Sequence, residues 1–167
     1  MRLAVGDIVV YRSHGAGPVT ARTSKLVLGT RHEVVVLALA GGLRVELPLE
    51  RAQEFLRPLA SESDLSRVQE ELGADQAVST DTWLKRQRQS VATLNDGDPI
   101  GLARIIRDGA RREAARASKD GISQLSVWER QIAAKARGLL STEIAFARSV
   151  EPEEANVWID RQLDQGR

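Results

Sequence analysis

The 167-residue chain contains no cysteine, only two histidines and few aromatic residues. The lack of cysteine excludes disulfides and thiolate-bound metals, and it fits a reducing compartment. No apolar run approaches the roughly 18 residues that a membrane-spanning helix needs, and the N-terminal segment lacks the apolar core of a signal peptide. We therefore expect a cytoplasmic protein that has no membrane partner.

Residues suited to catalysis are equally scarce. His14 lies in a glycine turn and His32 at the expected start of a strand, so a place on a loop surface is favoured for both over a metal site. The glycines of "HGAG" (14–17) lead into a strand and not into a helix, which argues against a phosphate-binding loop. The sequence therefore predicts a binding protein that uses no cofactor or metal, and not an enzyme.

Charge is unevenly distributed, although the net charge is only +1. Residues 59–82 carry one base and six acids, residues 83–148 carry thirteen bases and seven acids, and residues 149–167 carry two bases and five acids. A basic block between acidic flanks suggests a polyanionic partner. On charge alone, however, a set of solvated helix faces is the favoured interpretation.

The chain has two halves with different patterns. Residues 1–58 contain four or five short segments rich in valine and leucine, separated by glycine turns, which is typical of a small closed or nearly closed β-barrel. From about residue 60 the apolar residues recur with helical spacing. We therefore predict an α+β protein with a barrel domain in residues 1–58 and a bundle of four or five helices in residues 59–167.

Several helix ends carry clear signals. Asp98-Pro99 supplies an N-cap followed by proline at the first helical position. Ser126 and Glu129 match a capping box. The helix before them is expected to begin near 80–82, where a threonine or aspartate caps it, and to stop at "NDG" (95–97). Trp128 and Trp158 each lie on an apolar stripe, so packing is favoured for both.

Trp83 stands at the start of a basic stretch, "DTWLKRQRQ" (81–89). Periodicity predicts an apolar helix face, with Trp83 at its margin, formed by Leu84, Val91 and Leu94. Periodicity alone thus favours a core role for Trp83. Yet a flat apolar ring beside three cations also suits DNA, because cations hold phosphates and the ring props open a base step. Both interpretations stay open on the residues alone.

Five stretches together resemble the CarD/CdnL family of bacterial RNA-polymerase-binding transcription regulators. In order, they are "VGDIVVYRSHGAG" (5–17), "LPLERA" (47–52), "TWLKRQRQ" (82–89), "GDPIGLARIIRD" (97–108) and "LSVWERQIAAKARGLLSTEIAFA" (125–147). The first also resembles the polymerase-interacting domain of transcription-repair coupling factors. The tryptophan with its bases and the "GD" before the next helix are more specific to CarD. The resemblance covers nearly the whole chain.

The resemblance implies a Tudor-like or SH3-like barrel that docks on the β subunit of RNA polymerase. It also implies a helical domain that touches promoter DNA at the upstream edge of the melted bubble, where Trp83 would wedge into the minor groove and help to hold the open complex. The DNA-facing positions that it implies are Trp83, Lys85, Arg86, Arg88, Arg112, Arg130 and Lys135. We expect a monomer. The alternative is a protein-interaction adaptor with a partner-binding barrel and no specific DNA role.

At the polymerase-facing positions the sequence departs from the family pattern. Lys25 matches a basic position. Glu46, within "VELP", stands where the family often has a base, and Arg44 lies on the same strand face two positions earlier. The resemblance therefore implies that Glu46 weakens docking and that Arg44 partly compensates. Residues 117–125 also make a longer connection between helices than the family pattern has.

Overall fold

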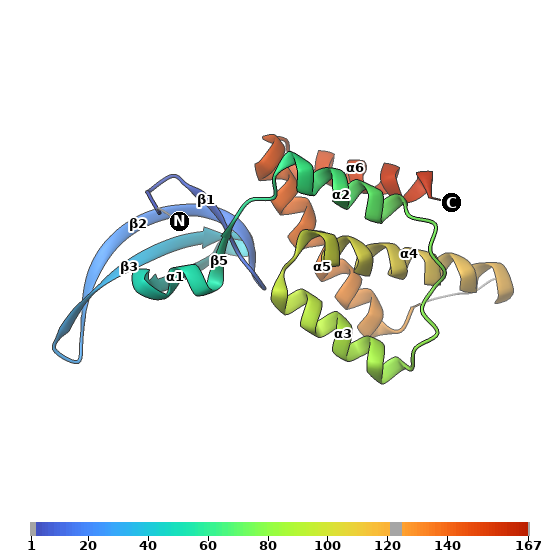
Figure 1. The fold of residues 1–167 in the computed structure, drawn as a ribbon, viewed down its shortest axis with the longest axis horizontal. Coiled ribbons are helices and arrows are strands. Elements are labelled where there is room, and N and C mark those ends of the chain that lie inside the picture. Colours follow the sequence, from blue (N-terminus) through green and yellow to red (C-terminus); the bar gives the residue numbers. More distant parts are fainter. Residues whose placement is uncertain (1–2, 121–124, 167) are drawn as a thin grey trace. The chain divides into compact units, whose positions relative to one another are not determined.

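The chain divides into two compact units, Met1–Leu59 and Ala60–Arg167. The computed structural model describes residues 3–120 and 125–166, apart from the side chains of residues 116–120. Within these residues the first unit holds a five-stranded antiparallel sheet and the second unit holds five helices (Figure 1). This architecture confirms the predicted α+β fold, with a Tudor-like first unit.

The sheet of the first unit has the strand order β4-β3-β2-β1-β5. Its strands are β1 (Ile8–Tyr11), β2 (Gly15–Val27), β3 (Thr30–Leu39), β4 (Leu43–Pro48) and β5 (Leu56–Pro58). Side chains alternate between the two faces of a strand, so Val35 and Leu37 of β3 point together into the core. Other strands add Val9, Val19, Leu47 and Leu56 to this core.

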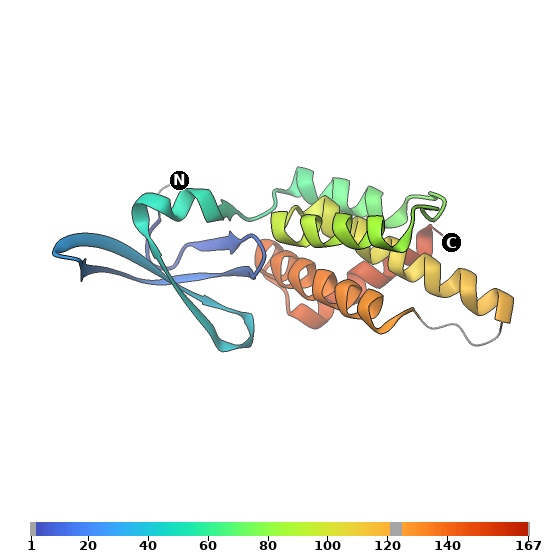
Figure 2. The same cartoon turned by 90° about the horizontal axis from the view of Figure 1, so that it is seen from below.

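The β2–β3 hairpin projects beyond the other strands (Figures 1 and 2). Residues 24–27 of β2 pair with residues 30–33 of β3, and neither stretch has a further strand partner among the described residues. Leu28 and Gly29 form its turn with φ values of 49° and 80°. Two positive φ angles in succession give the tight turn that suits the twist of a hairpin. At Leu28 this positive φ is a conformation that residues other than glycine disfavour.

Two details of the first unit differ from the sequence prediction. The helix α1 (Leu49–Phe55) was not predicted; it follows Pro48 and buries Ala52 in the core. The segment "HGAG" was predicted as a break, but β2 already begins at Gly15. Gly17 lies in this strand. Only glycine fits at this position, because a Cβ would lie 2.1 Å from the Ala38 carbonyl oxygen. Between β3 and β4, "AGG" forms the short 3-10 helix η1 (Ala40–Gly42), in keeping with the glycine turns predicted between the strands.

The helices of the second unit are α2 (Glu62–Gly73), α3 (Trp83–Asp96), α4 (Pro99–Asp120), α5 (Val127–Arg148) and α6 (Pro152–Gln165). Asp98 caps α4 by accepting a hydrogen bond from the Gly101 N–H at 2.8 Å. Ser126 and Glu129 form the predicted capping box of α5. The helix α3 ends at Gly97, whose φ of 67° is left-handed, as the "NDG" signal predicts. Within the predicted long connection, residues 121–124 lie outside the described residues.

The core of the second unit lies between four of its helices. The helix α4 packs against α2 and α5, and α6 packs against the same two helices (Figures 1 and 2). Fully buried residues from each of them meet there, among them Leu65, Leu102, Leu140 and Ile159. Trp158 packs against this core, as predicted, with the Arg148 guanidinium 4.6 Å from its ring centroid. Within the described residues, none of the helices is both long and apolar enough to span a bilayer.

The helix α3 is less embedded than its neighbours, and its predicted apolar face is wrong. Leu94 is buried, but Leu84 is 58% exposed and Val91 is 40% exposed. The side that α3 turns toward α4 and α5 instead carries Trp83 and Arg86. The reason is that contacts with α4 and with α5, a helix distant in sequence, fix the rotation of α3.

Candidate nucleic-acid interface

The helix α3 begins with a compact polar arrangement around its first turn. The Thr82 hydroxyl accepts a hydrogen bond from the Lys85 backbone N–H at 3.4 Å, which satisfies one of the free donors of the helix end. Lys85 Nζ lies 2.8 Å from the Asp81 carboxylate. The hydrogen bond from Lys85 is the main cause that holds the pKa of Asp81 below its ordinary value. The cation of Lys85 is thus paired, but on the open surface.

Arginine side chains hold the connection that leads into α3. Near the beginning of the connection, Arg111 donates hydrogen bonds to the backbone carbonyls of Ala74 at 2.6 Å and Gln76 at 2.9 Å. Near the end of the connection, Arg112 donates to the carbonyl of Ser79 at 2.7 Å, and Arg86 donates to that of Asp81 at 2.5 Å. Since Arg111 and Arg112 come from α4, the connection is tied to that helix along most of its length.

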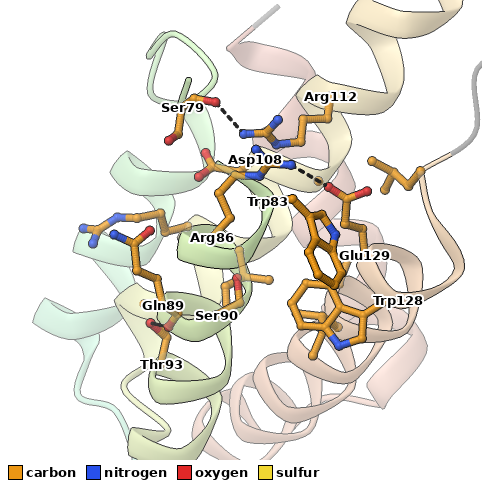
Figure 3. Close-up of a pocket in the computed structure, with 17 residues that line it drawn as sticks. Ser79, Trp83, Arg86, Gln89, Ser90, Thr93, Asp108, Arg112, Trp128 and Glu129 are labelled. Carbon is orange, nitrogen blue, oxygen red and sulfur yellow. Dashed lines mark hydrogen bonds and ion pairs between the residues drawn. The ribbon is translucent and has the colours of Figure 1, made fainter. Parts of the chain in front are cut away.

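Trp83 packs against Trp128, which lies in the first turn of α5. The ring centroids are 6.0 Å apart and the ring planes are inclined by 68°, an edge-to-face arrangement (Figure 3). Such a geometry places the positive edge of one ring on the negative face of the other. Trp83 remains 45% exposed, whereas Trp128 is half-buried. Trp83 is therefore a supported ring that still faces solvent.

An ion pair joins the same two helices beside the tryptophans. Arg86 lies 3.4 Å from Glu129 Oε1, and the side chains are 21% and 13% exposed (Figure 3). The other carboxylate oxygen of Glu129 accepts from the backbone N–H of Ser126 at 3.1 Å. Glu129 thus caps α5 with one oxygen and holds α3 with the other.

A cavity of about 130 Å³ lies between α3, α4 and α5. The two tryptophans and the Arg86–Glu129 pair form part of its wall. Arg112 and Asp108 of α4 lie on another side (Figure 3). Apolar groups of Ile105 and Ile132 also line the cavity. The wall is therefore mixed in character: aromatic and aliphatic surface beside charges of both signs.

In the first unit, the three predicted polymerase-facing residues form one charge cluster. The Glu46 carboxylate of β4 pairs with Lys25 of β2 through one oxygen and with Arg44 at 3.2 Å through the other. The hydrogen bond from Lys25 is the largest cause that lowers the pKa of Glu46 from its ordinary value. The charge reversal at position 46 therefore lies between two cations, and the cluster as a whole carries a net positive charge.

Two family models match the chain, the CarD C-terminal domain over residues 67–160 and the CarD-like/TRCF RID domain over residues 3–60. The chain belongs to the CarD family. It is a transcription-associated regulator that interacts with RNA polymerase, within a family of non-enzymatic transcription factors. The family resemblance that the sequence carries is thus confirmed.

The seven DNA-facing positions that the CarD resemblance implies fall into two groups. Trp83, Arg86 and Arg112 meet at the wall of the cavity. The remaining cations lie outside it with exposed side chains: Lys85, Arg88, Arg130 and Lys135. Within the described part of the chain, no ion pair involves Arg88, Arg130 or Lys135. The structure thus separates cations engaged inside the protein from cations open to a partner.

Trp128 and Glu129 belong to this site, but sequence reasoning gave them only packing and capping roles. Trp128 does pack, yet its partner is Trp83. One signal in the sequence points to the pair: each tryptophan lies in the first turn of a helix with a defined N-cap, at Thr82 and Ser126. A side chain in a first turn extends beyond the helix end and can meet another such side chain.

Proposed function

We propose that this CarD-family protein bridges the RNA polymerase β subunit and promoter DNA as a cytoplasmic monomer and stabilises the open complex. In this proposal Trp83 is a minor-groove wedge at the upstream edge of the bubble. The observation that carries it is the 45% exposure of the Trp83 ring at the start of a basic helix. Leu84, the next residue, is also exposed. Aromatic and aliphatic side chains of this kind unstack base steps in minor-groove complexes.

The exposed cations are the proposed phosphate contacts. Arg88, Arg130 and Lys135 are solvated, so a phosphate replaces only water and counterions around them. Lys85 has to share its ammonium group with Asp81. Arg86 and Arg112 differ, because hydrogen bonds to the backbone of the α2–α3 connection already engage them. We assign these two arginines to holding the connection and α3 in place beneath the DNA.

The charge cluster of Lys25, Arg44 and Glu46 is the proposed docking surface for the polymerase. Because Glu46 already occupies both cations, an acidic partner surface has to compete with it. This supports docking that is weaker than a base at position 46 would give. Arg44 compensates in part because, together with Lys25, it keeps the net charge of the cluster positive.

The adaptor without a DNA role remains the second candidate, and one observation favours it. Two of the six cations that the resemblance implies for DNA, Arg86 and Arg112, bond within the protein. An adaptor would use its exposed apolar and basic groups on a protein partner.

DNA binding separates the two candidates. The intact protein is titrated by fluorescence anisotropy with fork-junction DNA and with a plain duplex of the same sequence. A wedge predicts tighter binding to the fork, because unstacking costs less where base steps are already loosened. Equal binding to both DNAs contradicts the wedge, and undetectable binding to both supports the adaptor. Gel filtration with the β lobe of the polymerase tests the docking that both candidates share.

A further inference from the structure

The N-terminal half of α3 contacts the first turn of α5. Near its C-terminal end α3 is anchored by the buried Leu94. At its N-terminal end two neighbouring contacts join it to α5: Trp83 packs on Trp128, and Arg86 pairs with Glu129. Leu84 and Val91 between these ends are exposed. Trp128 and Glu129 thus contact the end of α3 that carries Trp83.

Trp128 is itself well fixed. It follows Ser126, whose hydroxyl and backbone N–H take part in the capping box with Glu129. The first turn of α5 is therefore held by hydrogen bonds of its own. A half-buried ring on such a turn is a firm support for a second ring.

We propose that Trp128 is a positioning residue for Trp83. It holds the Trp83 ring edge-to-face, with part of that ring turned to solvent, so that the wedge is ordered before DNA arrives. A ring already held in one conformation loses less entropy on insertion. Both rings also line the cavity of about 130 Å³. Without an aromatic ring at position 128, the Trp83 ring gains freedom and can turn toward that cavity, away from DNA.

This inference rests on the proposed wedge function of Trp83, and it differs from a direct DNA contact by Trp128. If Trp128 acts through Trp83, its removal has no effect once Trp83 is absent. If it touches DNA itself, the two losses add. Residues that act through each other give non-additive double-mutant cycles. The cycle therefore decides between the two roles.

The variants are chosen to keep the apolar packing. Trp128→Phe keeps an aromatic ring that can lie edge-to-face, whereas Trp128→Leu keeps apolar volume but no ring. Val127→Ala, in the same turn, alters an exposed side chain and serves as the matched control. Each variant is measured for affinity to fork-junction and duplex DNA and for its thermal midpoint. Near-ultraviolet circular dichroism reports the coupling of the two indoles.

We expect Trp128→Leu to weaken fork binding roughly two- to tenfold, because this factor corresponds to the free energy of an edge-to-face aromatic pair. Duplex binding should change little. Trp128→Phe should retain most of the affinity, and Val127→Ala all of it. In the Trp83→Ala background Trp128→Leu should cost nothing further. Unchanged or tighter fork binding by Trp128→Leu, or an additive double variant, overturns the proposal. If Trp83→Ala alone leaves fork binding unchanged, the wedge fails, whereas a loss confined to Trp83→Ala refutes only the role of Trp128.

Discussion

The Arg86 guanidinium of α3 lies 3.4 Å from the Glu129 carboxylate of α5, and both side chains are mostly withdrawn from solvent. Arg88, two residues later on the same helix, is exposed. Neighbouring arginines in one basic stretch therefore have different environments. Arg86 fixes the position of α3, and Arg88 is open to a phosphate. This difference can be measured.

Neutralising Arg88 should reduce DNA binding through electrostatics alone. For Arg88→Gln we expect the slope of log K against log salt to fall by about one, with no preference for sequence, because one phosphate contact is lost. The thermal midpoint should stay unchanged. Anisotropy titrations over a range of salt concentrations, together with thermal unfolding, measure both quantities.

Arg86→Gln should behave in the opposite way. It removes the ion pair between Arg86 and the half-buried Glu129, and losing a hydrogen bond to such a charged group costs about 1–3 kcal/mol of stability. We expect a lower thermal midpoint and an unchanged salt slope. A salt slope that falls as it does in Arg88→Gln, at a constant midpoint, would show that Arg86 contacts phosphate instead.

Replacing Glu46 by arginine should strengthen polymerase docking. Glu46→Arg removes the group that occupies Lys25 and Arg44 and adds a third cation. Charges at the rim of an interface act largely on the association rate, so the gain should shrink as salt rises. Glu46→Gln separates the loss of the negative charge from the added positive one and should give an intermediate affinity. Identical affinities for the β lobe at low salt would show that position 46 does not face the polymerase.

The pairing of Glu46 also predicts a pH dependence. Its folded-state pKa is lowered, chiefly by Lys25, below the ordinary value of 4.5. A carboxylate with a lowered pKa adds stability that is complete above the unfolded-state pKa and is lost as pH falls through the folded-state value. Unfolding of the wild type in acid should therefore show a component that Glu46→Gln lacks. An NMR titration of the Glu46 carboxyl group that midpoints at or above 4.5 would contradict the pairing.

The two units should fold separately. Glu143 is buried in the second unit and accepts a hydrogen bond from the Ala60 N–H at 2.9 Å. A helical fragment therefore has to include residue 59, so that Ala60 keeps its peptide N–H. We expect fragment 59–167 to be helical with a cooperative thermal transition and fragment 1–58 to be folded but marginal, as very small domains are. A random-coil circular dichroism spectrum for fragment 59–167 would show that the division is wrong.

Helix ends were predictable from the sequence because their causes are local. The carboxylate of Asp98 and the hydroxyl of Ser126 act on backbone groups three residues away, and both cap as expected. The helix α1 has no comparable signal. It is too short to be stable by itself, and it forms because Ala52 is buried against the sheet.

The orientation of α3 was not predictable from periodicity. A helical wheel assumes that the apolar side of a helix faces the core, which placed Leu84 and Val91 inside. In the folded chain the rotation of α3 is set by the contact of Trp83 with Trp128 and by an ion pair to Glu129, both far away in sequence. Only the three-dimensional structure brings these residues together.

In the proposed function Trp83 acts on DNA and not in the core. Trp83→Ala is compared with Val157→Ala, a variant of an exposed apolar residue on α6. For each we would measure the thermal midpoint and the half-life of the polymerase open complex. Truncating a buried tryptophan would cost about 3–5 kcal/mol. We therefore expect Trp83→Ala to lower the midpoint by much less and to shorten the half-life clearly. A large drop in midpoint contradicts the wedge, and an unchanged midpoint with an unchanged half-life contradicts any role of Trp83 in the open complex.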